Sequence, residues 1–404
     1  MRLTATVLAA TLGGALPAAA ECAFDNDVPV SILAPGFEAW KAIAAAMEEC
    51  GSVEASLDQE FRSKQPDALA ADPALYSVAG VNAATFATLS ERELIRPLDE
   101  LIAEHGQGIA ERQKVAIDGE VMAIAVMVNN QNLFYRRDVF EELGLEPPAT
   151  YAEMLDVAAE IEAAGVVEYP IGGTFATGFD IGEEFVNMYL GYGGALVGGG
   201  NEVALDREAG IAALETLAAM TGYMDPEYTI SDSTYVQQQF QQGKIAMANL
   251  WASRAGAMDD PAESQVVGLV ASAAAPSAVE GGPPASTQWW GGWTIAANVT
   301  DEEAEAAFRV MVEATDEEMV RANNDANIWL IDGYEPPEIA RGAIETLTAG
   351  APNYPASSAM ALLHTELGNA VPSFLTGERS AEETLAEIER RYETAAVEAG
   401  LIDG

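Results

Sequence analysis

The stretch IDGEVMAIAVMVNNQNLFYRRDVFEELGLEPPATYAEMLDVAAEI (117–161) contains an apolar strand followed by a capped helix. Residues 121–128 form a continuous apolar run, which is typical of a strand that is buried on both faces of a sheet. Thr150 and Glu153 form a capping box, in which a hydroxyl and an acid satisfy free backbone N–H groups where a helix begins. This motif predicts a helix over 151–164. A strand and a helix in this order favour an α/β architecture.

The same alternation continues on both sides of this stretch. Short apolar runs predict strands at 29–35, 53–57, 75–81, 121–128, 245–250, 266–271 and 293–297. Periodic apolar positions and capping residues predict helices at 37–49, 151–164, 207–221 and 233–242. Further capping boxes predict helix starts at Thr300 with Glu303, Thr315 with Glu318, and Ser380 with Glu383. Strands and helices that alternate in this way indicate α/β layers with parallel sheets.

The first residues have the composition of an export signal. The run MRLTATVLAATLGGALPAAA (1–20) carries one Arg, an apolar stretch and a small-residue end, which predicts a secretory signal peptide cleaved after Ala20. No later run reaches the roughly 18 apolar residues that a membrane-spanning helix needs. We therefore expect an exported protein of the periplasm that does not insert into the membrane.

The chain is strongly acidic. Without residues 1–20 it carries 18 Lys and Arg against 64 Asp and Glu. Such a surface repels nucleic acid and anionic lipid, so both are excluded as main partners. The hydrophobic fraction of 49% is too high for a disordered chain, and 404 residues suffice for two large domains.

The two cysteines, Cys22 and Cys50, flank the first predicted strand and helix. A disulfide is the first expectation for an exported chain. A strand at 29–35 that leads out and a helix at 37–49 that returns would bring Cys50 close to Cys22. Two free thiols are the alternative.

The sequence lacks the motifs of several catalytic classes. It contains no GxSxG, no Walker loop and no GxGxxG between a strand and a helix. His105 and His364 lie far apart, without Cys or carboxylate at metal-ligand spacing, so we expect neither a metal nor a cofactor. We interpret acidic pairs such as Glu183-Glu184 and Glu302-Glu303 as solvated helix faces, because acids are abundant throughout the chain.

Four segments in order resemble one protein family. They are Asp118-Gly119, the run from Tyr135 to Glu153 with Gly144-Leu145 and Pro147-Pro148, QQGKIAMANLW (241–251), and the pair Gly291-Gly292 at the start of a late strand. This pattern resembles the signature of family 1 extracellular solute-binding proteins. These are the ligand receptors of ABC importers and are related to maltose-binding protein.

The resemblance implies a two-lobed, type II-like periplasmic-binding-protein fold with a ligand cleft between the lobes. Three chain crossings would form the hinge, at 129–132, at Ser286–Gly292 and near Gly350. Lobe 1 would comprise 21–128 with 288–348, and lobe 2 would comprise 129–287 with 349–404. The implied partners are a small-molecule ligand and the permease subunits of an ABC transporter, and closure within one chain fits a monomer.

The tryptophans suggest a carbohydrate ligand. Trp289, Trp290 and Trp293 lie within five positions, separated by the pair Gly291-Gly292, which would let a ligand approach the backbone. An indole offers an apolar face and an N–H group, and sugar rings offer C–H faces and hydroxyls. Strand alternation places Trp289 and Trp290 on opposite faces, so we expect at least one of them to face the cleft. Trp293 could lie in the core or in the cleft.

Other residues are predicted to bind the ligand because of their place in the chain. Trp251 follows a buried strand and matches a family position that commonly stacks on sugar. The further candidates are Trp329 and Asn327 in a polar loop, Glu38 at a helix start, Asn82 after a strand, and Thr174, Phe175 and Asp180 in a Gly-rich loop after a strand. We expect Trp40 in the core, and Asn129 and Asn130 in the hinge.

The ligand class that fits these residues is a sugar, an oligosaccharide or a polyol. A tryptophan cluster on an acidic protein could instead form an aromatic cage for a cationic osmolyte of the betaine type. A secreted glycoside hydrolase is the second alternative, and such an enzyme would depend on carboxylates such as Asp180 or Glu38. The resemblance and the missing catalytic motifs favour a receptor that is not an enzyme.

Overall fold

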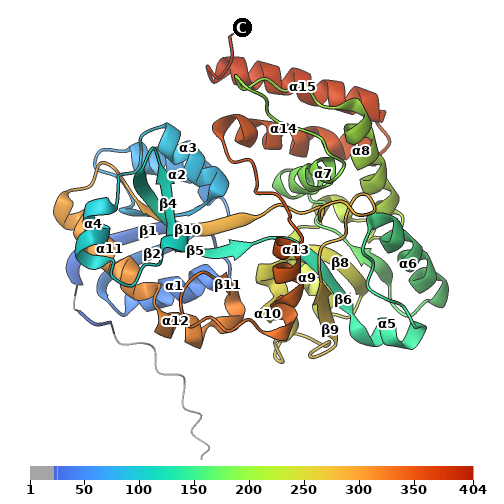
Figure 1. Ribbon diagram of the computed structural model, residues 1–404, viewed down its shortest axis with the longest axis horizontal. Coiled ribbons are helices and arrows are strands. Elements are labelled where there is room, and N and C mark those ends of the chain that lie inside the picture. Colours follow the sequence, from blue (N-terminus) through green and yellow to red (C-terminus); the bar gives the residue numbers. More distant parts are fainter. Residues whose placement is uncertain (1–21, 25, 404) are drawn as a thin grey trace, which may run out of the picture.

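The computed structural model describes residues 22–24 and 26–403, so the predicted signal peptide and its cleavage after Ala20 lie outside the described residues. The described chain forms two lobes, each built on its own β-sheet (Figure 1). The strands are β1 (Asn26–Ala34), β2 (Gly51–Leu57), β3 (Val78–Asn82), β4 (Lys114–Ile117), β5 (Glu120–Asn129), β6 (Gln131–Arg136), β7 (Tyr169–Gly172), β8 (Ile245–Trp251), β9 (Val270–Ala273), β10 (Trp289–Ile295) and β11 (Ile328–Trp329).

Helices cover the faces of both sheets. The α-helices are α1 (Glu38–Glu48), α2 (Phe61–Ala70), α3 (Ala83–Glu91), α4 (Asp99–His105), α5 (Arg137–Leu143), α6 (Tyr151–Ala164), α7 (Phe179–Gly191), α8 (Arg207–Thr221), α9 (Ser233–Gln241), α10 (Ala255–Met258), α11 (Asp301–Ala314), α12 (Glu317–Ala322), α13 (Arg341–Thr348), α14 (Ser358–Leu375) and α15 (Ala381–Glu398). None of the helices in the described part of the chain combines the length and the apolar character needed to cross a membrane.

The first lobe is built on the larger sheet, whose strand order is β11-β5-β10-β3-β1-β2, with β4 paired to β5. On one face of this sheet, α1 and α11 bury Trp40 and Phe308 together with Trp293 of β10. On the other face, α2 and α3 bury Phe61 and Phe86. Both faces are therefore closed by helices, which explains why the inner strands β3 and β5 contain runs of buried apolar residues.

The second lobe contains the smaller sheet, of order β7-β8-β6-β9. Its core on one side joins Phe134 of β6 to Val236 and Phe240 of α9. The other side packs against α6 and a helical layer of α7, α8, α14 and α15, which Figure 1 shows together at one end of this lobe. The C-terminal helices thus belong to the second lobe.

Both sheets are mixed, so the expectation of parallel sheets was only partly right. β1 runs parallel to β2 and β3, and β7 runs parallel to β8. In contrast, β10 is antiparallel to β3 and β5, and β6 is antiparallel to β8 and β9. The reversal of β10 has a topological cause, because β5 leaves the larger sheet toward the second lobe whereas β10 enters it from that lobe.

The predicted helix starts agree with the structure except at one position. The side chains of Thr150, Thr300 and Ser380 each accept a hydrogen bond from the backbone N–H three residues later. At α12 the capping residue is Asp316, and the prediction of Thr315 was wrong. The Thr315 hydroxyl instead donates to Met311 O in the last turn of α11, at 2.6 Å.

Three segments connect the lobes. The first runs from β5 into β6 through Asn130, and the second leads into β10. The third was expected near Gly350, but α13 already packs against β9 and β6 of the smaller sheet. The chain therefore leaves the larger sheet after β11, and 341–348 lie with the second lobe, unlike the expected division. The remainder of that division stays a prediction.

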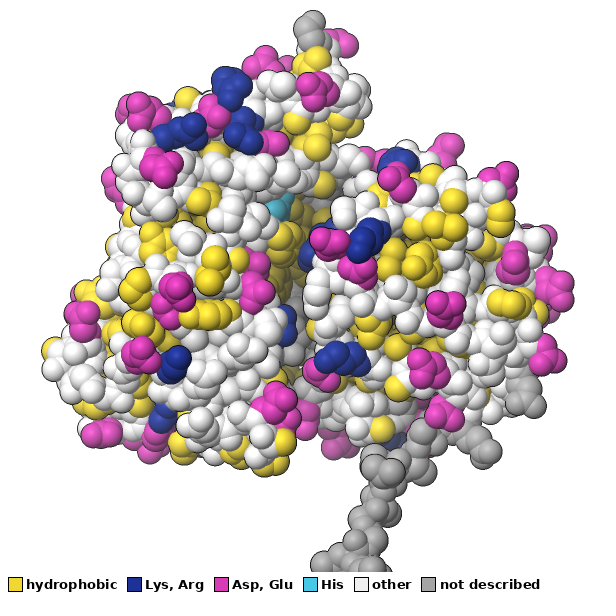
Figure 2. Space-filling view, turned by 180° about the vertical axis from the view of Figure 1, so that it is seen from behind, with side chains coloured by type: hydrophobic (Ala, Val, Ile, Leu, Met, Phe, Trp, Pro, Cys, Tyr) yellow, Lys and Arg dark blue, Asp and Glu magenta, His cyan; other side chains and the backbone are white. Residues whose placement is uncertain are grey.

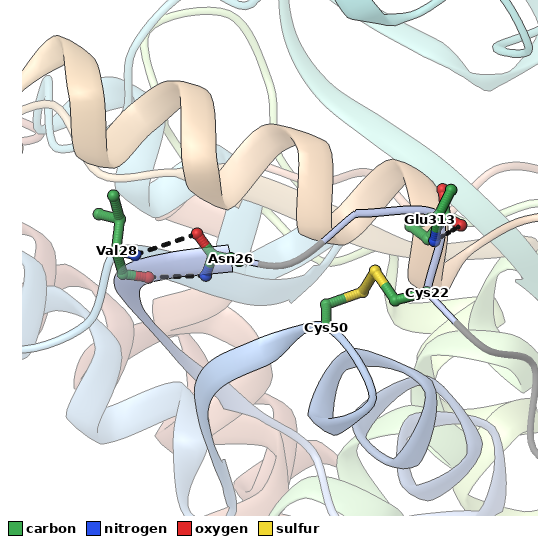
Figure 3. The surroundings of a disulfide bond; sticks show 6 residues. Cys22, Asn26, Val28, Cys50 and Glu313 are labelled. Carbon is green, nitrogen blue, oxygen red and sulfur yellow. Dashed lines mark hydrogen bonds between the residues drawn. A yellow bond between two sulfur atoms is a disulfide. The ribbon is translucent and has the colours of Figure 1, made fainter.

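The predicted disulfide between Cys22 and Cys50 is confirmed (Figure 3). Cys50 follows α1 and is buried at the start of β2, where it lies next to the N-terminal segment. The Ala23 backbone N–H donates to Glu313 of α11 at 2.7 Å. The bond and this contact hold the N-terminal segment against the first lobe.

Candidate functional site

A cleft of about 460 Å³ lies between the two lobes. In space-filling view the boundary between the lobes is a deep groove (Figure 2). The cleft is lined from the first lobe by Pro35, Phe37, Trp40, Gln59, Phe61, Arg62, Val81, Asn82, Met127, Asn129, Trp290, Gly291 and Asn327. It is lined from the second lobe and the second crossing by Phe179, Asp180, Asp232, Ser233, Thr234, Trp251, Ser253, Arg254 and Trp289.

Trp289 is the centre of an aromatic cluster at this cleft. Trp251 meets it edge to face with ring centroids 6.1 Å apart, and Phe179 does so at 5.9 Å. The ring of Tyr354 covers it at a centroid distance of 3.9 Å. Because only 5% of Trp289 is exposed, it acts as the base on which Trp251 and Phe179 rest rather than as an open platform.

The neighbouring tryptophans have different environments. Trp290 is half-buried and packs edge-on against Phe86 of α3, with centroids 5.2 Å apart. Trp293 is fully buried against Phe308, which settles its place in the core. The register between β10 and β5 shifts between Gly291 and Gly292, so simple alternation does not hold along this strand.

Arg62 is a cation of the first lobe that reaches the second lobe. Its guanidinium lies over the Phe179 ring at 4.1 Å and over the Phe61 ring at 4.8 Å. Within the described part of the chain, no carboxylate lies within ion-pair distance of it. Its donors are therefore available to a ligand.

Asp180 follows Phe179 on α7 and faces the same space. Burial raises the pKa of its carboxyl to about 7, and the charge of Asp232 adds to this, whereas Arg62 and Arg254 oppose it. Asp232 caps α9 by accepting the Tyr235 N–H at 2.8 Å. Asp180 and Asp232 therefore lie close enough in the second lobe for the charge of Asp232 to raise the pKa of Asp180.

Arg254 is the second cation of the cleft. It donates to Ser233 Oγ at 2.8 Å and to Gln237 Oε1 at 3.2 Å. Burial lowers the pKa of Arg254, and Asp232 and Asp180 oppose this. Two arginines and two aspartates therefore line the cleft of a chain whose formal charge is −45. The cleft is locally balanced in charge and offers both donors and acceptors.

Most of the predicted ligand-binding residues come together at this cleft. Those that line it are Trp251, Trp289, Trp290, Gly291, Asn327, Asn82 and Asp180. Trp40, expected in the core, is only 1% exposed yet also borders the cleft. Asn129, expected in the hinge, lines the cleft and exchanges two 3.2 Å hydrogen bonds with Ser253.

Trp329 and Gly292 lie elsewhere. Trp329 is buried in the first lobe, where its indole N–H donates to Asn323 O at 3.0 Å, so the polar loop is anchored by it. A Cβ on Gly292 would lie 2.1 Å from Ile124 O of β5. This glycine is needed for strand pairing rather than for approach of a ligand.

Thr174, Phe175 and Glu38 also do not line the cleft. Thr174 and Phe175 are buried in the second lobe, the first bonded to Glu184 and the second packed against Tyr228. Glu38 is exposed and pairs with Lys41 at 2.6 Å. The first residues of the Gly-rich loop therefore pack in the core of the second lobe, and the chain reaches the cleft only at Phe179 and Asp180.

Several cleft residues were missed by sequence reasoning. They are Phe37, Gln59, Phe61, Arg62, Phe179, Asp232, Ser233, Thr234, Ser253 and Arg254. A signal was available for Arg254, because cations are scarce in this chain and Arg254 lies four residues after the predicted strand at 245–250.

Glu183 and Glu184 are buried at 1% and 2% exposure, so their interpretation as a solvated face was wrong. Glu183 Oε1 accepts from Thr287 Oγ1 at 2.6 Å and from Trp289 Nε1 at 2.9 Å. Glu184 Oε1 accepts from Gln131 Nε2 at 2.8 Å and from the Thr174 hydroxyl. Burial raises the pKa of Glu183 to about 7 and that of Glu184 to about 8.

Among the described residues there is no group of three or more His, Cys, Asp or Glu side chains placed to hold a metal ion. The cleft chemistry that remains is aromatic stacking, hydrogen bonding and balanced charge. This set of groups can hold an organic solute between the lobes.

Comparisons with known proteins identify the family. The model of the family "bacterial extracellular solute-binding protein" matches residues 41–334. A relative from Brucella abortus (strain 2308) is 25% identical over 170 residues, and the match spans 41% of each chain.

Two solved structures have a similar fold. An ABC transporter solute-binding protein from Agrobacterium radiobacter K84, in complex with ribitol, has a TM-score of 0.80 and 18% identity over 92% of this chain and 99% of its own. Maltose-bound MalE3 of T. maritima has a TM-score of 0.77 and 16% identity over 91% and 100%. With the family model covering most of its length, the chain belongs to the bacterial extracellular solute-binding proteins.

Proposed function

We propose that this protein is the substrate-binding component of an ABC importer and that it captures a sugar, an oligosaccharide or a polyol. The observation that carries the proposal is the cleft itself, where indole rings lie beside unpaired donors and acceptors from both lobes. Trp251 offers an apolar surface, Arg62 offers N–H donors, and Asp180 offers acceptors. Hydroxylated rings and chains need this combination of groups.

The charge balance of the cleft favours a neutral ligand. Arg62 and Arg254 lie beside Asp232 and beside Asp180, whose carboxyl is only partly charged near pH 7 because burial raises its pKa to about 7. A cationic ligand therefore finds no excess negative charge in the cleft. The two guanidinium groups would also repel a quaternary ammonium group. A polyhydroxylated neutral solute therefore fits better than a betaine-type cation.

Capture would proceed by closure of the lobes around the three connecting segments. A ligand that touches both lobes binds the closed state more tightly, and this differential affinity shifts the equilibrium toward closure. The closed protein would deliver its ligand to the permease subunits of the transporter. We propose that it does so as a monomer in the periplasm, after removal of residues 1–20.

The proposal is tested by measuring binding of ribitol, D-mannitol and maltose, with glycine betaine as the cationic comparison. A solute at 100 times its dissociation constant should raise the free energy of unfolding by about 2.7 kcal/mol. Chromatography of the released solute separates a receptor from a glycoside hydrolase, since a receptor returns maltose intact. Binding of glycine betaine alone, or cleavage of maltose, would refute the proposal.

A further inference from the structure

Two consecutive acids on α7 hold the two β-strand connections between the lobes. Glu184 binds Gln131, the first residue of β6 directly after the first crossing. Glu183 binds Thr287 and Trp289, which lie immediately before and at the start of β10 in the second crossing. One helix of the second lobe is therefore tied to both crossings through adjacent side chains.

Glu183 also fixes the aromatic base of the cleft. Its Oε1 atom accepts the indole N–H of Trp289 at 2.9 Å, and the same N–H also lies 3.0 Å from Thr287 Oγ1, whose hydroxyl donates to Glu183. The ring face of Trp289 is covered by Tyr354. Tyr354 is in turn bonded to the second crossing, since its backbone N–H donates to Gln288 O at 3.0 Å. Trp251 and Phe179 rest on Trp289, so a shift of this indole would move two cleft walls.

The carboxyl of Glu183 has an unusual bonding state. Oε1 accepts two hydrogen bonds, whereas the buried Oε2 has no partner within hydrogen-bond distance among the described residues. A buried oxygen without a partner is costly and needs a reason. The strong acceptor at Oε1 supplies that reason, because a carboxylate binds an N–H group more strongly than a neutral acceptor does.

We propose that Glu183 is a positioning residue for ligand binding, which anchors Trp289 and the second crossing to α7, while Glu184 anchors the first crossing. The inference rests on the proposed function for its ligand, but the contact between Glu183 and Trp289 is testable in the ligand-free protein. Neither acid touches the cleft space itself.

Other charged groups surround Glu183, and a pH experiment must account for them. Glu184 and Asp180 lie on the same helix, and Arg62 approaches from α2. Tyr354 faces it from the segment 349–357, and the Tyr354 hydroxyl is hydrogen-bonded to His364 of α14 at 2.8 Å. Burial lowers the pKa of His364 to about 4, which keeps this histidine neutral. Because burial raises the pKa of Glu183 to about 7, its charge changes in an accessible pH range.

The first experiment follows the Trp289 indole N–H by NMR in ligand-free protein labelled with ¹⁵N-tryptophan, and Trp289→Phe assigns the signal. We expect the signal to move between pH 5.5 and pH 8.5, to lose most of this movement in Glu183→Gln, and to keep it in the matched variants Glu184→Gln and Asp180→Asn. A signal whose position and pH dependence are both unchanged in Glu183→Gln would overturn the proposal whether or not a ligand is found.

The second experiment measures affinity for whichever of ribitol, D-mannitol and maltose binds saturably. Glu183→Leu removes the acceptor and should weaken binding about tenfold, whereas Glu183→Gln keeps an oxygen acceptor and should stay within about threefold. In the Trp289→Phe background the effect of Glu183→Leu should become smaller, because the N–H donor is already gone and only the hydrogen bond from Thr287 remains to be lost. Equal losses in both backgrounds would contradict the proposal, and if Glu183→Leu does not fold, the NMR comparison of Glu183→Gln with Glu184→Gln decides.

Discussion

Trp251→Ala should weaken ligand binding strongly while leaving the fold intact. Trp251 is the last residue of β8, and it is half-buried, with one edge resting on Trp289. Its remaining surface borders the cleft. The indole therefore stabilises the complex more than it stabilises the empty protein.

The expected loss of affinity follows from the surface that the ligand would cover. If the ligand covers half of the roughly 200 Å² that a buried tryptophan contributes, at about 25 cal/mol per Å², the loss is about 2.5 kcal/mol. That corresponds to a dissociation constant raised roughly 60-fold.

Trp293→Ala is the matched control, since this indole is fully buried against Phe308. It should lower the free energy of unfolding by roughly 3–5 kcal/mol and leave the affinity of the folded fraction nearly unchanged. Calorimetric titration with the bound solute, together with chemical denaturation of both variants, measures the two quantities. If Trp251→Ala binds normally, or destabilises the protein as much as Trp293→Ala does, the assignment of Trp251 to the cleft surface is wrong.

Three further predictions concern the fold and its motion. Replacing both Cys22 and Cys50 by Ser removes the disulfide that joins residues 28 positions apart. This change should lower the free energy of unfolding by about 3–4 kcal/mol in denaturant titrations. Saturating ligand should reduce the radius of gyration in solution scattering at constant mass, and an unchanged radius would argue against hinge closure. Burial raises the pKa of Glu184 above its unfolded value, so its contribution to stability is present at low pH and is lost as pH rises from about 4.5 to about 8. Glu184→Gln should therefore reduce the fall of the unfolding free energy with pH in this range by on the order of 1 kcal/mol per pH unit. Parallel stability profiles of the two proteins would refute the assignment.

Local patterns in the sequence were sufficient to locate many elements of the fold. The capping residues Thr150, Thr300 and Ser380 act through bonds that span three positions, so the sequence contains the whole interaction. The error at Thr315 has the same local origin, because Asp316 also lies three residues before a free N–H group and the two residues compete. Strand direction could not be predicted in this way, because the antiparallel direction of β10 depends on a crossing between the lobes that local patterns do not specify.

Sequence reasoning located cleft-lining residues near the ends of predicted strands and missed residues whose place depends on the opposite lobe. Trp251, Asn82 and Asp180 follow apolar strands or their loops and lie at the cleft. Arg62 lies on α2 and reaches the cleft only because Phe179 of the other lobe stands opposite it. Nothing in the residues around Arg62 shows that contact. Trp329 was predicted to line the cleft because its loop is polar, but its indole is buried and anchors that loop to the first lobe.

The pairs Glu183-Glu184 and Glu302-Glu303 show why abundance is a weak guide to the role of an acid. Glu302 is exposed in the first turn of α11, and Glu303 bonds the Thr300 backbone N–H at 2.8 Å, which are the roles expected of acids at a helix start. Glu183 and Glu184 have the same sequence but lie inside α7, which is packed between α14, α8 and the crossings, so neither side of the helix faces solvent. A buried acid persists only where donors compensate its desolvation, and here the donors are Thr287, Trp289, Gln131 and Thr174. The burial of these acids is therefore compensated by the two connecting segments that they bind.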